Sequence, residues 1–388
     1  MRLTESIQIT RENKLYNELD RFCFLSKNLY NSSLYAIRQH FFNTKKYKNY
    51  NSLNKDFIQS HQIDYYALPT KVSQQTMKMV DQNFKSFFGL LKLKSKKAKI
   101  PKYLKKQGRY EIIFTIQSIS QKELKKGFLK LSGINQKIKI RNTITNIQQV
   151  RIIPKETFNC YNIEIVYKVS EKQLKKDNKK YASIDLGINN IATVAFNCQK
   201  PFIINGKPLK SINQYYNKKR SKLTNIKTRK AKLLNRKRDN KIKDYLHKAS
   251  RYITNHLVYN NINTLIIGKN DGWKQEVNIG KKNNQNFVSI PFEKFIFMLQ
   301  YKCNLEGINV IIREESYTSK CSFIDNEEIK KHETYLGKRI KRGLFKTAFG
   351  KIINADLNGS LNIMKKVVGE FQYPIEACST PVMVTLQN

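Results

Sequence analysis

The most constraining feature of this sequence is an aspartate between two apolar runs, in the stretch YASIDLGINNIATVA from Tyr181 to Ala195. The runs on either side of Asp185 have the length and composition of buried strands, and Gly187 marks a tight bend between them. Burying a carboxylate is costly unless it is paired or bound to a metal ion. The stretch therefore predicts a strand, a bend and a second strand, with Asp185 either capping the turn or binding a metal.

A second acidic residue opens a helix near the end of the sequence. Asp356 lies within INADLNGSLNI, and Leu357, Leu361 and Met364 recur after it at helical spacing. Asp185 and Asp356 are thus two acidic residues that lie beside apolar segments far apart in the sequence, and two unrelated caps are one explanation for them.

These motifs together resemble the TnpB (OrfB) proteins of bacterial insertion sequences. DLGINNIAT and NADLNGSLNI are similar to the first and third acidic motifs of that family. Three further segments of this sequence also match family motifs: LIIGKN, WKQ and EESYTSK. The match is densest over 181–367. Those proteins resemble the RuvC-type, RNase H-fold nucleases of type V CRISPR effectors. The resemblance implies an RNA-guided, Mg²⁺-dependent DNA endonuclease of a transposable element, with a guide RNA and double-stranded target DNA as partners. By the same resemblance, Asp185 and Asp356 would be ligands of a two-metal Mg²⁺ site, in which two ions about 4 Å apart activate a water and stabilise the leaving oxygen of a phosphodiester.

The third acidic ligand of the family is displaced in this sequence. Gly268 stands where the family usually has a glutamate, but the next strand ends in Glu314 and Glu315. In an RNase H-like sheet that strand is parallel to the Gly268 strand, which lies beside the Asp185 strand, so its tip is about 9–10 Å from Asp185. A glycine at 268 leaves room for a glutamate to cross.

Glu315 is our candidate because some similar family members carry the glutamate at this later position, before a Tyr-Thr-Ser or like sequence. Glu314 and Asp271 are its rivals, and two surface charges ending a strand are the alternative. Without a third carboxylate, the sequence would favour a nuclease-inactive, RNA-guided DNA-binding repressor. A protein-guided transposase or resolvase is a further alternative.

The segment before Asp356 departs from the family in its cysteines. The family usually carries two CxxC pairs forming a zinc ribbon, but between Ser319 and Asp356 this chain has only Cys321 and His332. A structural zinc site needs about four protein ligands. We therefore expect no structural zinc and interpret 319–353 as a degenerate zinc ribbon, with the basic run 338–343 over the nucleic-acid channel.

The charge balance indicates a polyanionic partner. The sequence has 73 Lys and Arg against 29 Asp and Glu, a formal net charge of +44, and such a surplus repels itself unless a polyanion such as nucleic acid neutralises it. The segment 209–262 reads as helical and very basic, with almost no acidic partners before Asp239, which favours a phosphate-contacting surface. Its candidate nucleic-acid-binding residues are Lys218, Lys219, Arg220, Arg229, Lys230, Arg236, Lys237 and Arg238.

The spacing of apolar residues changes along the chain between helical and strand periodicity, which predicts an α+β multidomain protein. Residues 1–180 should form a nucleic-acid-binding domain, an antiparallel β-barrel with a helical insertion at about 10–100; 181–370 should form an RNase H-like (RuvC-type) mixed α/β domain, and 371–388 a tail. No apolar run is long enough to cross a membrane, and the first residues lack a signal peptide's apolar core. Six scattered cysteines favour reduced thiols and a cytoplasmic location.

Overall fold

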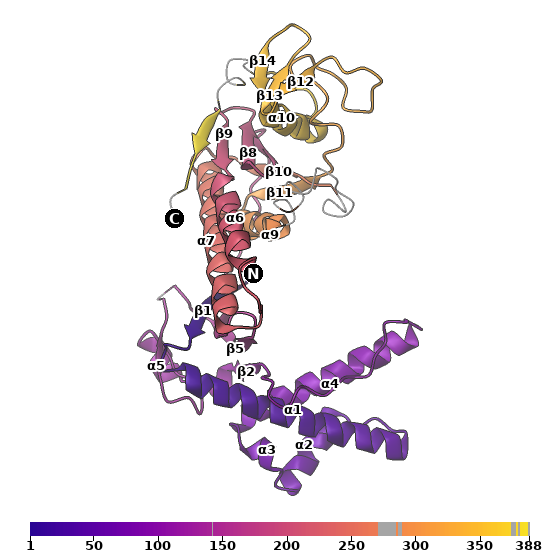
Figure 1. The fold of residues 1–388 in the computed structure, drawn as a ribbon, viewed down its shortest axis with the longest axis vertical. Coiled ribbons are helices and arrows are strands. Elements are labelled where there is room, and N and C mark those ends of the chain that lie inside the picture. The colour runs from indigo at the N-terminus through magenta and orange to yellow at the C-terminus, as the bar shows by residue number, and fades with distance from the viewer. Residues whose placement is uncertain (142, 271–284, 286–288, 374–377, 379–380, 387–388) are drawn as a thin grey trace. The chain divides into compact units, whose positions relative to one another are not determined.

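The computed structural model describes residues 1–141, 143–270, 285, 289–373, 378 and 381–386, which belong to two compact units. Unit 1 is Met1–Ser170 and unit 2 is Glu171–Asn388 (Figure 1). In the described ranges, no helix is both long and apolar enough to cross a membrane.

The helical insertion that the sequence predicted at about 10–100 contains, in the described chain, two long helices, α1 and α4, with two shorter helices, α2 and α3, between them. Asn49 and Gln62 cap the two shorter helices, each accepting a hydrogen bond from a backbone N–H with its side chain. The bounds are α1 Tyr16–Thr44, α2 Tyr50–Gln59, α3 Ile63–Tyr66 and α4 Thr70–Lys92.

The main sheet of unit 1 is antiparallel and open, so the predicted closed barrel is wrong. Its order is β1-β6-β5-β2, and the edge strands β1 and β2 do not pair with each other in the described chain. The apolar face, including Phe114, Val150 and Ile163, packs against α1 and α4 in one core. Because helices already cover this face, the sheet needs no closure to bury it.

The remaining elements of unit 1 are short. A second, two-stranded sheet consists of β3 and β4. The bounds are β1 Arg2–Thr10, β2 Ile112–Thr115, a 3₁₀ turn Ile116–Ser118, α5 Gln121–Lys125, β3 Phe128–Leu129, β4 Ile138–Lys139, β5 Ile147–Lys155 and β6 Cys160–Lys168.

Unit 2 is built on a six-stranded mixed sheet with the order β11-β10-β7-β8-β9-β15. Three consecutive strands form an antiparallel meander, while β10 runs parallel to β7, β11 parallel to β10, and β15 parallel to β9. The mixed sheet and the order of β7, β10 and β11 are as the sequence predicted, whereas β15 comes from 371–388, which we predicted to be a tail. The bounds are β7 Tyr181–Asp185, β8 Asn190–Phe196, β9 Phe202–Asn205, β10 Thr264–Gly268, β11 Asn309–Arg313 and β15 Val382–Val384.

Helices cover both faces of this sheet, as Figure 1 shows for α10, α7 and α9. On one face Ile266 packs with α10 (Ala355–Val368), and the Ser183 hydroxyl donates a 2.7 Å hydrogen bond to the Ser360 carbonyl. On the other face Ile184 and Ile267 join a core with α7 (Arg229–Tyr259) and α9 (Phe292–Leu305). Alternate residues of one strand thus enter two different cores, as the pleat requires.

Two inserted segments complete unit 2. The basic segment predicted at 209–262 is two helices, α6 (Lys207–Arg220) and α7, which are separated by residues 221–228. The side chain of Thr228 caps α7 by accepting a hydrogen bond from the N–H of Ala231. Ahead of α10, a three-stranded antiparallel sheet comprises β12 (Lys338–Lys341), β13 (Leu344–Lys346) and β14 (Ile352–Asn354). Strand β14 runs directly into α10, so this small sheet is fixed to the helix that carries Asp356.

Candidate functional site

Three carboxylates that are far apart in the sequence converge at one edge of the unit 2 sheet. Asp185 ends β7, Glu315 follows β11 by two residues, and Asp356 lies in the first turn of α10. The pKa of Asp185 is raised well above its usual value, first by burial and then by the negative charges of Glu315 and Asp356. The carboxylates of Glu315 and Asp356 therefore lie within electrostatic range of Asp185.

Gly268 and Gly359 make this convergence possible because side chains occupy the space where their Cβ atoms would lie. A Cβ on Gly268 would lie 2.6 Å from Glu315 Oε2 and would overlap Ile363 Cδ1. A Cβ on Gly359 would lie 2.9 Å from Asp185 Oδ2. The glutamate therefore crosses over the end of β10, through the room that the sequence predicted at Gly268.

The two carboxylate oxygens of Glu315 differ in their partners. Oε1 accepts a hydrogen bond from the side-chain amide of Asn270 at 3.4 Å. Oε2 is buried and has no hydrogen-bond partner among the described residues. A buried carboxylate oxygen without a partner is costly unless a proton or a cation reaches it. Together with the two neighbouring carboxylates, this oxygen fits a hard divalent cation.

Asp356 is held by an amide and a guanidinium. Its Oδ2 accepts from the side chain of Asn190 at 2.7 Å, and its Oδ1 lies 3.4 Å from an Nη2 of Arg339 on β12. Among the described residues, no three His, Cys, Asp or Glu side chains are close enough together to coordinate one ion as they stand. Arg339 supplies part of the positive charge that the acidic cluster requires.

Asp185, Glu315 and Asp356 are the residues that would hold Mg²⁺ here. A bound pair of such ions would activate a water and stabilise the leaving oxygen of a phosphodiester. The three side chains supply negative charge. The end of β7 fixes the position of Asp185, the turn after β11 fixes that of Glu315, and α10 fixes that of Asp356. Their catalytic role stays a prediction.

The rivals of Glu315 differ in position. The carboxylate of Glu314 is mostly exposed, lies 3.0 Å from the ammonium of Lys366, and accepts from the N–H of Ser316. Glu314 is not among the charges that raise the pKa of Asp185, whereas Glu315 is. Asp271 and the WKQ motif lie outside the described residues.

Sequence reasoning missed three polar residues that contact the carboxylates: Asn190, Asn270 and Arg339. The two asparagines lie inside the motifs DLGINN and LIIGKN, which the sequence analysis had singled out. No local pattern, however, predicts which carboxylate a side-chain amide will bind. Arg339 lies in the basic run predicted to cover the channel. Only the strand pairing of β12 with β13 brings its guanidinium to Asp356.

We expect the stability of the metal-free protein to depend on pH through Glu315. Burial raises the pKa of this carboxyl from its usual 4.5 to about 7, and the charge of Glu314 adds to the rise. Between these values the folded state retains a proton that the unfolded state loses, so the free energy of unfolding falls as pH rises from 4.5 towards 7. Urea unfolding in EDTA at several pH values should reveal the fall. A Glu315→Gln variant with an equally steep dependence would contradict the assignment.

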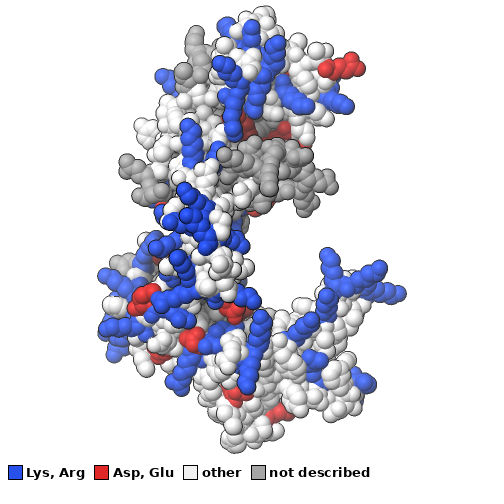
Figure 2. All heavy atoms as spheres, viewed as in Figure 1, with Lys and Arg blue, Asp and Glu red and all other residues white. Residues whose placement is uncertain are grey.

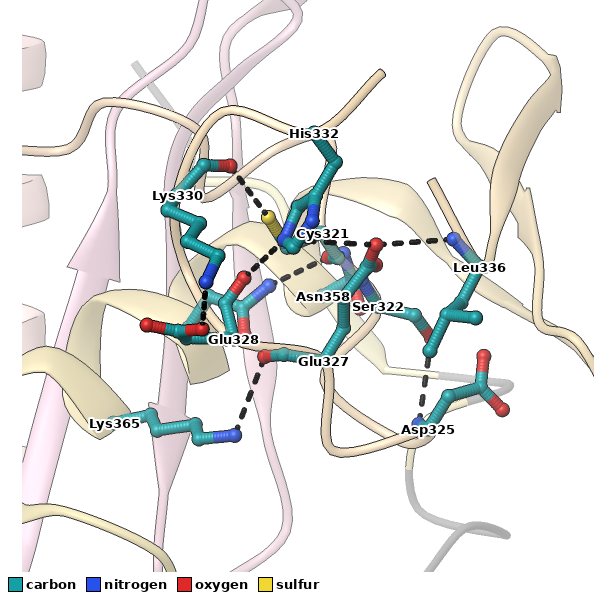
Figure 3. A network of polar contacts seen from close by, with 11 residues as sticks. Cys321, Ser322, Asp325, Glu327, Glu328, Lys330, His332, Leu336, Asn358 and Lys365 are labelled. Carbon is teal, nitrogen blue, oxygen red and sulfur yellow. Dashed lines mark hydrogen bonds and ion pairs between the residues drawn. The ribbon is translucent and has the colours of Figure 1, made fainter. Parts of the chain in front are cut away.

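A buried carboxylate cross-links the segment that replaces the zinc ribbon (Figure 3). Glu327 accepts hydrogen bonds from the N–H of Ser322 at 2.7 Å and of Leu336 at 3.0 Å. Asn358 of α10 donates to the carbonyl of Cys321 at 2.8 Å, while the Cys321 thiol hydrogen-bonds to a backbone carbonyl. Side-chain hydrogen bonds thus connect chain segments that a zinc ribbon would connect through metal.

We therefore expect purified protein to retain no structural zinc. Elemental analysis after removal of loosely bound metal is the measurement, and a stoichiometric amount of zinc would refute the expectation. Glu327→Gln replaces an acceptor of backbone N–H groups with an amide, so it should lower stability by about 1–3 kcal/mol. A chelator should leave the unfolding curve of the parent protein in place.

The basic residues predicted to bind nucleic acid divide into two sets in the structure. Arg238 donates to Asn213 at 2.8 Å and lies over the ring of Tyr216, and Arg220 donates to the Tyr216 hydroxyl at 3.1 Å. Arg238 of α7 therefore holds that helix against α6, whereas the bond between Arg220 and Tyr216 lies within α6. The exposed residues of the set are Lys218, Lys219, Arg220, Arg229, Lys230 and Lys237, with Arg236 half-buried.

Basic side chains are also abundant beyond this segment. Figure 2 shows Lys and Arg on both units on the face drawn, with few acidic side chains between them. No Asp or Glu occurs between Leu186 and Arg238 in the sequence. Without acidic neighbours along α6 and the start of α7, the exposed lysines there favour phosphate contacts over internal ion pairs.

Comparison with known proteins agrees with the sequence motifs. Residues 164–274 match the family model of the probable transposase OrfB_IS605, and residues 292–363 match the Cas12f1-like TNB domain. The TnpB-like protein ORF457 of Acidianus two-tailed virus is 25% identical, over 91% of this chain and 84% of that protein. These matches confirm the resemblance to TnpB and OrfB proteins.

Two further comparisons concern CRISPR proteins. The CRISPR-associated endodeoxyribonuclease Cas12f2 of a Micrarchaeota archaeon is 29% identical over 49% of this chain and 38% of that protein. A solved structure of the mini-RNA-guided endonuclease CRISPR-Cas_phi3 covers 96% of this chain and 94% of that chain, with 9% identity and a TM-score of 0.48.

Proposed function

We propose that this chain, which is similar to TnpB and OrfB proteins, is an RNA-guided, metal-dependent DNA endonuclease of a transposable element. The observation that carries the proposal is the convergence of Asp185, Glu315 and Asp356 at one sheet edge. Three carboxylates with one unpartnered buried oxygen are the donor set that divalent-metal phosphodiester hydrolysis requires.

The order of the strands supports an RNase H-like, RuvC-type domain. An antiparallel meander is followed by two strands parallel to its first member, with helices on both faces. Asp185 lies at the carboxyl end of β7, and Glu315 follows the carboxyl end of β11 across one intervening strand. Because the strands are parallel, these ends lie at the same edge of the sheet. The strand order and the carboxylate cluster therefore both support metal-dependent phosphodiester hydrolysis.

The test of the proposal is reconstitution. The protein would be expressed together with the DNA flanking its gene, and any RNA that copurifies would be sequenced. A double-stranded DNA matching the RNA guide should then be cut with Mg²⁺ and left intact with EDTA. The absence of a bound RNA, or cutting independent of the RNA sequence, would favour a protein-guided transposase or resolvase instead.

A guided DNA-binding repressor without nuclease activity is the second candidate. One observation favours it: Arg339 already pairs with Asp356, so the acidic cluster is partly neutralised without a metal ion. Tight guided binding of matched DNA, with no cleavage at any Mg²⁺ or Mn²⁺ concentration, would identify the repressor.

We expect the exposed lysines of α6 to contribute to nucleic-acid affinity. Reversing the charge at Lys218 and Lys219 removes two candidate phosphate contacts, which should weaken binding and lower the slope of log affinity against log salt by about 2. Filter binding at several salt concentrations measures the slope. The same reversal at the exposed residues Lys176 and Lys200 is the matched control. An unchanged slope in the α6 variant would exclude this contact surface.

A further inference from the structure

We infer that Asn270 and Lys366 are positioning residues that fix the orientation of Glu315 from two sides. The inference rests on the proposed function, because it takes Glu315 to be a metal ligand. Asn270 follows β10 and Lys366 lies in the last turn of α10, so the two residues tie the turn after β11 to both neighbouring elements. No local pattern in the sequence marked Lys366.

Asn270 contacts both the backbone and the side chain of Glu315. Its Oδ1 accepts from the Glu315 N–H at 3.1 Å, and its Nδ2 donates to Glu315 Oε1 at 3.4 Å. The N–H of Lys269 donates to the carbonyl of Arg313 at 2.9 Å, so the pairing of β10 with β11 continues to this point. One amide thus sets the position of the main chain and the rotation of the carboxylate at the same time.

Lys366 binds the chain on either side of Glu315. Its ammonium donates to the carbonyl of Glu314 at 3.2 Å, to the carboxylate of Glu314 at 3.0 Å and to the carbonyl of Ser316 at 2.8 Å. These contacts use all three N–H donors of a lysine, and the side chain is only 14% exposed. Because α10 also carries Asp356, the contacts of Lys366 set how far Glu315 lies from that carboxylate.

The remaining polar groups of Glu315 account for its orientation. Thr318 donates its hydroxyl to the Glu315 carbonyl at 2.8 Å. The N–H, the carbonyl and Oε1 are therefore all engaged, whereas Oε2 lies over Gly268 without a partner among the described residues. With Oε1 held by Asn270, Oε2 lies against Gly268, at the end of the strand between β7 and β11. Residues that orient a metal ligand by hydrogen bonds typically change metal affinity by about 10–100-fold when they are removed.

The test measures Mn²⁺ binding to the full-length protein by electron paramagnetic resonance of the free ion, without nucleic acid. Four variants are compared with the parent protein: Asn270→Ala, Lys366→Met, Lys366→Gln and Glu315→Gln. Matched controls are Asn263→Ala, just before the start of β10, and Lys365→Met, the neighbouring lysine on α10. Thermal unfolding of each variant confirms that it is folded.

We expect Asn270→Ala and Lys366→Met to bind Mn²⁺ about tenfold more weakly, and both controls to bind it as the parent does. Lys366→Gln retains N–H donors and should recover part of the affinity. Parent-like Mn²⁺ affinity in Asn270→Ala and Lys366→Met, alongside weakened binding by Glu315→Gln, would overturn the positioning role alone. Unchanged binding by Glu315→Gln would overturn the proposed role of Glu315 itself.

A purely structural role predicts a different result. Loss of packing would lower the unfolding temperature of Asn270→Ala and Lys366→Met while leaving the Mn²⁺ affinity of the folded fraction unchanged. That pattern would contradict the inference. If Lys366→Met does not fold, Lys366→Gln and Asn270→Ala decide the matter, since each removes only part of the contacts around Glu315.

Discussion

Replacing Glu315 with glutamine should abolish guided DNA cleavage while leaving guide and target binding intact. The substitution keeps the volume of the side chain and removes one negative charge from the acidic cluster that includes Asp185 and Asp356. A metal site stabilises the transition state by several kcal/mol, and each 1.4 kcal/mol is a factor of ten in rate, so cleavage should fall at least about a hundredfold. Single-turnover cleavage and equilibrium binding of the same target measure the two effects separately.

Glu314 provides the matched control for this prediction. Glu314→Gln removes an adjacent, mostly exposed carboxylate that pairs with Lys366, so cleavage should change far less than in Glu315→Gln. Alanine at Asp271 serves as a second comparison, because the sequence left it as a rival. Full cleavage by Glu315→Gln would refute the assignment, and loss of cleavage only in Glu314→Gln would move the third ligand to that residue.

The second large effect is expected from Gly268→Ala, which removes no carboxylate at all. A Cβ at this position would lie 2.6 Å from Glu315 Oε2 and would overlap a methyl group of Ile363. Forcing extra volume into such a contact costs about 1–3 kcal/mol in stability. It should also displace the carboxylate, and a misplacement of about 1 Å at a reacting centre costs about a hundredfold in rate.

Gly89→Ala is the matched control, because nothing lies within 4 Å of the Cβ that would be added there. Alanine in the interior of helix α4 should be neutral or stabilise the protein by up to about 1 kcal/mol. The measurements are urea unfolding and single-turnover cleavage. Undiminished cleavage by Gly268→Ala would show that the glutamate does not need to cross the end of β10.

The sequence by itself predicted the central strands of unit 2. The apolar runs on either side of Asp185, with a bend at Gly187, correspond to β7 and β8, and the predicted strand ending at Gly268 corresponds to β10. The helical spacing after Asp356 likewise predicted α10. Buried strands and amphipathic helices carry their signal in neighbouring residues, so no tertiary contact is needed to find them.

The same local reasoning failed where packing decided the outcome. An antiparallel sheet was predicted for unit 1, yet it does not close into a barrel, because α1 and α4 cover its apolar face instead. The short helices α2 and α3 depend on two capping side chains, Asn49 and Gln62, and on burial of a few residues against α1 and α4.

For the candidate site, the sequence supplied the carboxylates and the tertiary structure supplied their surroundings. Asp185 and Asp356 stood out because a charge beside buried apolar residues is costly, and Gly268 pointed to the space that Glu315 crosses. The partners Asn270 and Lys366 did not stand out, because amides and lysines are common on surfaces. Hydrogen bonds between residues 45 to 52 positions apart depend on how β10, β11 and α10 pack, and only the folded chain determines that.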